Sequence, residues 1–234
     1  MKQIDVCLTP ELLYQHKIDN TIVIVVDIFR ATSCMVTGFA YGVEAIIPVA
    51  TIDECNALRA LGHYGAAERN GSTPEGYDLD NSPFSYMNEK FVGSTIAVTT
   101  TNGTLAITKS RGAVKVMIGA FLNLGALSQY LKNQQYDVLV LCAGWKGKPN
   151  LEDTLFAGAL VDRLQDSFAI SEDAAMMAQR LYQQGKNDML GFVANSSHVR
   201  RLQRLGIQKD IAYCLQEDLY DVLPVLRGNQ LVRM

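Results

Sequence analysis

The chain has 234 residues, 48% of them hydrophobic and 19% charged, which is typical of a folded globular protein and excludes the disordered and fibrous classes. Its net charge of −3 creates no long-range field toward nucleic acid or an anionic membrane. The longest apolar runs, such as residues 22–26, are far shorter than the roughly 18 residues of a membrane-spanning helix, so we expect one domain over residues 1–234 with no nucleic acid or membrane as partner.

The start of the chain and its cysteines indicate a cytoplasmic protein. Asp5 interrupts the apolar stretch that a signal peptide requires. No two of the five cysteines have C-x-x-C spacing, and the three histidines lie far apart in the sequence. We therefore expect free thiols in a reducing compartment, and neither a thiolate zinc site nor a histidine-rich metal site.

Short β-branched runs at residues 21–26, 45–49, 95–99, 114–118 and 138–142 predict buried strands. Helical patterns follow most of them: a capping box from Thr51 to Glu54 precedes residues 55–61, and further helices are expected over residues 105–110 and 152–164. This alternation predicts an α/β fold, a three-layer α/β/α arrangement with a mainly parallel sheet. The sequence also permits two similar lobes with a boundary near residues 111–113.

Residues 62–83 contain repeated glycines and prolines and show no periodicity, so they predict a long loop. Loops of this length inside a compact domain are commonly functional. This one contains Glu68 and Arg69, and later Asn81 and Ser82. We interpret residues 81–83 as a turn with local hydrogen bonds, in which ligand contact is a secondary role.

Polar residues follow the first predicted strand, where ligands of parallel sheets bind. Asp27 and Arg30 lie three residues apart at this turn. The pair can hold a cation and an anion side by side. An N-capping aspartate with an arginine salt bridge explains the same residues equally well.

A second polar turn follows the strand at residues 95–99 and leads into the next helix. It consists of Thr100, Thr101, Asn102, Gly103 and Thr104. Backbone amides at a helix start, together with threonine hydroxyls, favour binding of an anion. A simple helix cap is the alternative, although a cap needs only one of these hydroxyls.

A third polar turn follows the strand at residues 138–142 and contains Lys146, Glu152 and Asp153. The two carboxylates can simply complement the dipole of the helix that they begin. Together with Asp27 and Glu68 they can also form the all-oxygen site that Mg²⁺ prefers. Lys146 is then available for a negatively charged substrate, although a solvated surface lysine is the ordinary case.

The sequence resembles one family over nearly its whole length, the 2-phosphosulfolactate phosphatases. The resemblance rests on several segments that occur in the family's order and with similar spacing. These segments are residues 26–32, 68–71, 76–83, 100–104, 142–144, 152–153 and 157–158, with a closing segment around residues 200–224. Asp80 departs from the pattern, because the family is expected to have glycine there. The absence of G-x-S-x-G, P-loop and G-x-G-x-x-G motifs removes the common alternatives.

The resemblance implies Mg²⁺-dependent hydrolysis of (R)-2-phospho-3-sulfolactate to 3-sulfolactate and phosphate, a reaction of coenzyme M biosynthesis and of a separate sulfolactate pathway. Asp27, Arg30, Glu68 and Asp153 are the expected catalytic residues, and Asp27, Glu68, Glu152 and Asp153 are expected to supply or orient Mg²⁺. Arg30 and residues 100–104 would hold the phosphate. Arg69 or Lys146 would bind the sulfonate or the carboxylate, because these groups need their own cations.

Several alternatives stay open from the sequence. Water can attack phosphorus directly, or Asp27 can form a phosphoenzyme. His198 is a candidate general acid, although a lone histidine before two arginines is more often a surface residue. The enzyme can act on another small phosphorylated acid, or the chain can be a non-catalytic small-anion-binding protein. The high apolar content favours a homo-oligomer, with a dimer as the simplest case.

Overall fold

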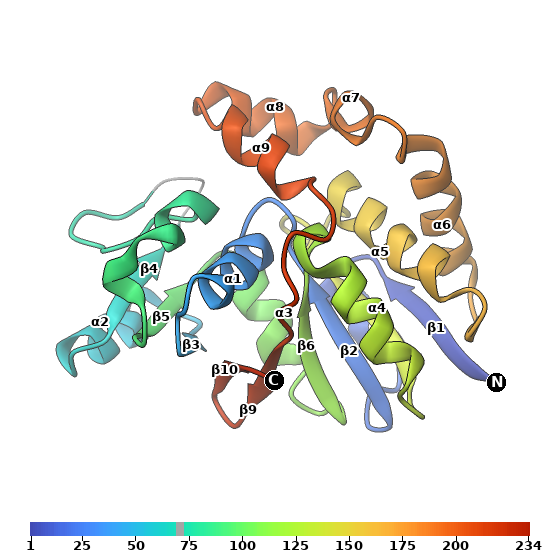
Figure 1. Cartoon of the computed structure of the whole chain (residues 1–234), viewed down its shortest axis with the longest axis horizontal. Coiled ribbons are helices and arrows are strands. Elements are labelled where there is room, and N and C mark those ends of the chain that lie inside the picture. The colour runs from blue at the N-terminus through green and yellow to red at the C-terminus, as the bar shows by residue number, and fades with distance from the viewer. Residues whose placement is uncertain (69–72) are drawn as a thin grey trace.

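The structure is a computed structural model that describes residues 1–68 and 73–234. Within these residues a ten-stranded sheet forms the centre, with the strand order β4-β5-β3-β10-β9-β6-β2-β7-β1-β8. Helices cover both of its faces, which confirms the predicted three-layer α/β arrangement (Figure 1). No helix in the described part of the chain is long and apolar enough to cross a membrane.

The bounds of the strands are as follows. They are β1 (Lys2–Cys7), β2 (Thr21–Val26), β3 (Ala45–Pro48), β4 (Tyr64–Ala67), β5 (Thr95–Thr99), β6 (Lys115–Gly119), β7 (Asp137–Cys142), β8 (Phe168–Ile170), β9 (Pro224–Arg227) and β10 (Gln230–Arg233). The α-helices are α1 (Ala31–Ala40), α2 (Ile52–Ala60), α3 (Gly103–Lys109), α4 (Leu124–Lys132), α5 (Leu151–Leu164), α6 (Asp173–Gly185), α7 (Met189–Val193), α8 (Ser197–Arg204) and α9 (Gln208–Cys214). Short 3₁₀ segments are η1 (Pro10–Gln15), η2 (Pro83–Met87), η3 (Glu89–Phe91) and η4 (Phe121–Asn123).

The sheet contains two parallel blocks. One consists of β4, β5 and β3, and the other of β6, β2, β7, β1 and β8. The hairpin of β9 and β10 lies between the blocks and pairs antiparallel with β6 on one side and β3 on the other. The sheet is therefore mainly parallel within each block, and mixed as a whole.

The apolar runs form the buried strands that their composition predicts. Every residue of β2 is buried, because this strand has neighbours on both sides and helices on both faces. The capping box is also present: the Thr51 hydroxyl accepts from the Glu54 N–H, and the Glu54 carboxylate accepts from the Thr51 N–H. These local signals place the helices and strands whose ends carry the site.

The loop predicted over residues 62–83 is wrong in one part, because Tyr64–Ala67 forms β4 and pairs in parallel with β5. This short strand contains glycine and alanine and lacks the β-branched run that marked the other strands. The neighbouring strand supplies its hydrogen bonds, so pairing within the sheet decided its conformation. Glu68 consequently follows a strand, as Asp27 does.

Candidate active site

The ends of β2, β4, β5 and β7 meet beneath α8 and α9, which lie over the top of the sheet in Figure 1. A narrow cavity of about 20 Å³ lies there. The predicted residues that line it are Asp27, Arg30, Glu68, Asn81 and Asn102. A wider cavity of about 330 Å³ shares Arg30, Glu68 and Asn81 with it and is also lined by Asp80 and Ser82. The two cavities therefore adjoin.

Asp27 lies at the end of β2 and is 8% exposed. Its carbonyl oxygen accepts from the N–H and the hydroxyl of Thr32, which fixes the turn into α1. Burial raises the pKa of its carboxyl group from 3.8 to about 6. His198 opposes this increase in pKa, and the carboxylates of Glu68 and Glu152 add to it. Asp27 is thus a buried acid in a cluster with an excess of negative charge.

Asp153 connects the ends of two neighbouring strands from the first turn of α5. Its Oδ1 accepts from the Ile28 N–H at 2.8 Å, and its Oδ2 accepts from the Gly144 N–H at 3.1 Å. Burial raises the pKa of Asp153 well above its ordinary value, and Glu152 and Asp27 raise it further. Because both carboxylate oxygens bond to backbone N–H groups, Asp153 positions the loops after β2 and β7.

Glu152 and His198 form a buried pair. Glu152 Oε1 lies 2.5 Å from His198 Nδ1, and Glu152 Oε2 is buried without a hydrogen-bond partner in the described part of the chain. The surface position expected for an isolated histidine is wrong for His198, which is 7% exposed and lines the narrow cavity. Its helix, α8, packs over the strand ends, and this tertiary contact is not visible in the sequence around the histidine.

Arg30 is also buried, and its partner comes from α9. Arg30 Nη1 donates to Asp210 Oδ2 at 2.5 Å. The turn thus presents Asp27 and Arg30 to the same cavity, and Asp210 partly compensates the charge of the arginine. This ion pair also joins α9 to the start of α1.

The turn after β5 combines a helix cap with a close approach to Asp27. The Thr100 hydroxyl accepts from the Thr104 N–H at 3.2 Å, and the Thr104 hydroxyl donates to the Thr100 carbonyl at 3.0 Å. A Cβ at Gly103 would lie 2.9 Å from Asp27 Oδ2, so only glycine fits there. The buried Thr101 hydroxyl has no hydrogen-bond partner.

The remaining predicted residues lie at different depths. Asn102 Oδ1 accepts from the Lys146 N–H at 3.4 Å, while the Lys146 side chain is exposed. Ser82 is buried, and its N–H donates to Asp80 Oδ1 at 2.9 Å. Arg69 lies outside the described residues.

Sequence reasoning missed Arg201 and Trp145, which both line the narrow cavity. The Arg201 guanidinium lies 3.8 Å from the centre of the Trp145 ring. One signal was available: Arg201 follows His198 by three positions, so a helix places both on one face. The proximity of that face to Asp27 was not available, because it depends on the packing of α8.

The donors at the cavity suit a magnesium ion that keeps most of its water. Among residues 1–68 and 73–234, no group of three His, Cys, Asp or Glu side chains is arranged to hold a metal. Mg²⁺, however, commonly uses one or two carboxylates together with water and phosphate oxygens. Asp27 and Glu68 line the cavity and fit this role, whereas the oxygens of Asp153 bond to the backbone.

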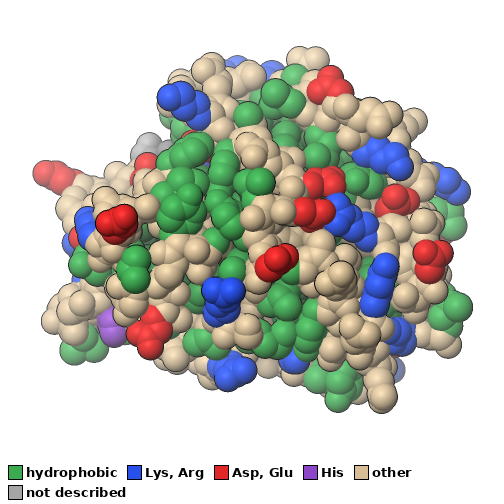
Figure 2. Space-filling view, viewed as in Figure 1, with side chains coloured by type: hydrophobic (Ala, Val, Ile, Leu, Met, Phe, Trp, Pro, Cys, Tyr) green, Lys and Arg blue, Asp and Glu red, His purple; other side chains and the backbone are tan. Residues whose placement is uncertain are grey.

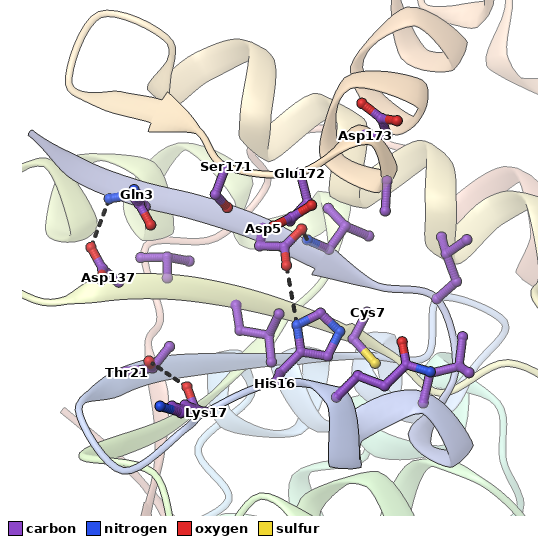
Figure 3. Close-up of a pocket in the computed structure, with 17 residues that line it drawn as sticks. Gln3, Asp5, Cys7, His16, Lys17, Thr21, Asp137, Ser171, Glu172 and Asp173 are labelled. Carbon is purple, nitrogen blue, oxygen red and sulfur yellow. Dashed lines mark hydrogen bonds and ion pairs between the residues drawn. The ribbon is translucent and has the colours of Figure 1, made fainter.

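A larger cavity of about 760 Å³ lies elsewhere, beside β1 and β7. Figure 3 shows its labelled polar residues, among them the ion pair of Asp5 and His16, whose nearest atoms are 3.1 Å apart. None of the predicted site residues that the structure describes lines it. Size alone therefore does not identify the site, and the convergence of strand-end residues does.

The comparisons with known proteins agree with one another on a single family. The family model described as 2-phosphosulpholactate phosphatase matches residues 7–229. A Thermotoga petrophila protein named probable 2-phosphosulfolactate phosphatase is 42% identical, over 87% of this chain and 88% of its own length. Proteins of the same name are 33% identical in Clostridium beijerinckii, over 98% of both chains, and 34% identical in Synechocystis sp., over 92% of both.

Proposed function

The chain belongs to the 2-phosphosulfolactate phosphatase family, and from this premise we propose that it hydrolyses (R)-2-phospho-3-sulfolactate to 3-sulfolactate and phosphate with Mg²⁺ as cofactor. The observation that carries the proposal is the convergence of Asp27, Glu68 and Arg30 from separate elements on one cavity. Carboxylates beside an arginine suit a site that must hold a metal ion and a phosphate ester together.

The acidity of the cavity supports a role for a divalent cation. Burial and the neighbouring carboxylates Glu68 and Glu152 raise the pKa of Asp27, which shows that negative charge is unfavourable in this cavity. A phosphate ester is itself negatively charged, so it needs additional positive charge to bind there. We assign Asp27 and Glu68 as the protein ligands of Mg²⁺. Mg²⁺ bound there supplies positive charge that offsets the charge developing on the phosphoryl oxygens. Asp153 and Glu152 act by orienting the strand-end loops and His198.

The two adjoining cavities provide places for the two ends of the substrate. We place the phosphoryl group in the narrow cavity beside Asp27, with Asn102 and Arg30 as donors. The sulfonate and the carboxylate then occupy the wider cavity of about 330 Å³, a volume within the range of small-ligand sites. From the sequence, we assign Arg69 or Lys146 to the sulfonate or the carboxylate.

His198 is the group that we assign as proton donor to the leaving oxygen. Its Nδ1–H donates to Glu152, which leaves Nε2 to carry the proton that the alkoxide needs. The Glu152 carboxylate holds the ring in place. The proposal thus gives the buried pair a function in the reaction.

The substrate assignment is tested by phosphate release from 2-phosphosulfolactate, 2-phospholactate and 3-phosphoglycerate with purified protein. We expect the highest kcat/KM for the sulfonated substrate, because a site that pairs each anionic group penalises an analogue that leaves a cation unpaired. Equal values for 2-phospholactate would remove sulfolactate as the basis of specificity. Asp27→Asn is the control that reports contaminating phosphatase.

We further propose that the enzyme acts in the cytoplasm as a homodimer and serves coenzyme M biosynthesis. The five cysteines are all free thiols, which is usual for a reducing compartment. Hydrophobic side chains gather over α1 and beside α9 in Figure 2. Exposed hydrophobic residues near these helices include Tyr41, the C-cap of α1, and Phe84, whose ring contacts Tyr213 of α9, and such patches commonly bind another protein surface. Light scattering of the wild type and of Phe84→Glu tests the dimer.

A further inference from the structure

Arg201 differs from the other arginines of its helix. It lies on the face of α8 that carries His198 and Leu202, and all three line the narrow cavity. Arg200 is exposed and donates to the carbonyl of Asn195 at 2.7 Å. Arg204 is exposed in the last turn. Arg201 is therefore the arginine of α8 that is directed at the Asp27 site.

The Arg201 guanidinium is held in place, but one of its hydrogen-bond donors lacks an acceptor among the described residues. It lies over the Trp145 ring at 3.8 Å from the ring centre, which is a favourable cation–π contact. Its Nη2 atom is buried and has no hydrogen-bond partner among residues 1–68 and 73–234. A buried donor without an acceptor is costly, so this geometry fits a site whose acceptor arrives with a ligand.

Arg30 shows the contrasting case. Its Nη1 donates to Asp210 at 2.5 Å, so its charge has a partner before any ligand binds. Arg30 lines both cavities, whereas Arg201 lines only the narrow one. Arg201 therefore faces the end of the substrate that meets Asp27, and it does not face the space assigned to the sulfonate and carboxylate.

The surroundings of Arg201 keep it charged and aimed at an anion. Burial lowers the pKa of the guanidinium, and the carboxylates of Glu152, Glu68 and Asp27 oppose that decrease. An arginine stays protonated at neutral pH in either case. The narrow cavity of about 20 Å³ adjoins the wider one, and a group that enters it lies in contact with its walls.

We propose that Arg201, held against Trp145, donates hydrogen bonds to the non-bridging oxygens of the phosphoryl group and stabilises the charge that they gain in the transition state. The inference rests on the proposed phosphatase reaction and extends it to a residue that touches the transferred group. The planar fork of arginine matches two phosphoryl oxygens, and lysine offers only a point charge. Trp145 is a positioning residue in this scheme.

The experiment compares Arg201→Ala and Arg201→Lys with Arg204→Ala, an exposed arginine on the same helix, in kcat and KM for 2-phosphosulfolactate. We expect kcat to fall by about 10²–10³-fold in Arg201→Ala, the usual effect of removing one donor to a transition-state oxyanion. Arg201→Lys should recover part of this loss, and Arg204→Ala should match the wild type. Added guanidinium should partly restore Arg201→Ala, which a merely structural role would not explain.

Calorimetric titration with inorganic phosphate separates this inference from the proposed function. Weaker phosphate binding in Arg201→Ala than in Arg204→Ala supports the contact, even if the wild type hydrolyses a different phosphate ester. Wild-type turnover and phosphate affinity in Arg201→Ala would overturn the contact and leave the phosphatase assignment intact. A wild type that neither binds phosphate nor hydrolyses any ester would overturn both.

Discussion

Asp27 is the residue at which burial and chemistry conflict. Its carboxylate is removed from water and faces the carboxylates of Glu68 and Glu152, with His198 as an opposing cation. Such a group lowers the stability of the protein at neutral pH, because the folded state holds a charge that water would solvate better. Functional sites often carry this cost, and a substitution can remove it together with the activity.

Asp27→Asn should therefore stabilise the metal-free protein and abolish turnover. The amide can still accept the hydrogen bond from the Ala31 N–H, and it removes the buried charge. We expect the free energy of unfolding at pH 7 to rise by about 3 kcal/mol, because each unit of the Asp27 pKa shift corresponds to roughly 1.4 kcal/mol. Urea denaturation in EDTA measures it, with the exposed Asp166→Asn as control.

The pH dependence of this effect has a definite sign. The pKa of Asp27 is about 6 in the folded protein and 3.8 ordinarily, so the folded state binds more protons between these values. The contribution of Asp27 to stability is therefore fully present below pH 4 and is lost as pH rises toward 6 and above. Asp27→Asn should lack this part of the slope. An unchanged slope would contradict the assignment of the raised pKa to Asp27.

His198→Gln should lower kcat by about 10²-fold, because glutamine cannot supply a proton to the leaving oxygen. Steady-state rates between pH 5 and 9 measure this effect. His63→Gln is the control, since His63 precedes β4 and does not line the narrow cavity. Unchanged turnover and pH profile in His198→Gln would exclude His198 as the acid.

Single residues at strand ends could be predicted from the sequence because the parallel-sheet rule concerns local order along the chain. Asp27, Glu68, Asn81 and Asn102 were found in this way or by resemblance, and all line the narrow cavity. Arg201 was not found as a site residue. Its contribution depends on how α8 packs over the sheet, and no spacing in the sequence encodes that contact.

At the scale of elements, the close packing of α5 on α6 fixes where Glu152 and Asp153 lie. Gly158 permits this approach, because a Cβ there would lie 1.9 Å from the carbonyl oxygen of Ala178 on α6. Backbone atoms cannot yield as a flexible side chain can. The first turn of α5, and with it the carboxylates of the site, therefore depends on a glycine farther along the helix.

Gly158→Ala should destabilise the protein by about 2–3 kcal/mol, the usual range for overpacking, and lower its thermal midpoint. The added methyl group must push α6 away from α5. Gly112→Ala is the matched control, since the nearest heavy atom to its Cβ would be 3.8 Å away. If Gly158→Ala melts at the wild-type temperature, the described helix contact is incorrect.

Some strands of this fold can be predicted from a sequence pattern, and others cannot. The β-branched runs of β2, β5 and β7 predicted those strands because buried parallel strands need such residues on both faces. β4 and β8 lack a comparable run and are set by their neighbours, β5 and β1. Pairing within the sheet outweighs local propensity at such short strands.

For the whole molecule, the arrangement of the two parallel blocks creates the site. The two blocks are joined by three successive antiparallel pairs, β3 with β10, β10 with β9 and β9 with β6. The strands of one block are therefore antiparallel to the strands of the other. Yet Glu68 and Asn102 from one block line the same cavity as Asp27 and Gly144 from the other. Strand ends of both blocks therefore contribute to one cavity, although the blocks are antiparallel to each other.

This arrangement could not be predicted from the sequence. The hairpin of β9 and β10 comes from the end of the described chain, and it inserts between strands that are formed by much earlier residues. Its long-range pairing leaves no local signal beyond two short apolar stretches. The alternation of strands and helices predicted the layers, while the order of the strands depended on contacts between distant segments.

The central claim is that Asp27 and Glu68 hold a magnesium ion that is needed to remove phosphate from 2-phosphosulfolactate. Phosphate release with Mg²⁺ and with EDTA, in the wild type and Glu68→Gln, tests it most directly. We predict release that EDTA abolishes, that added Mg²⁺ restores, and that Glu68→Gln recovers only at a higher Mg²⁺ concentration. Equal release in EDTA would contradict the account.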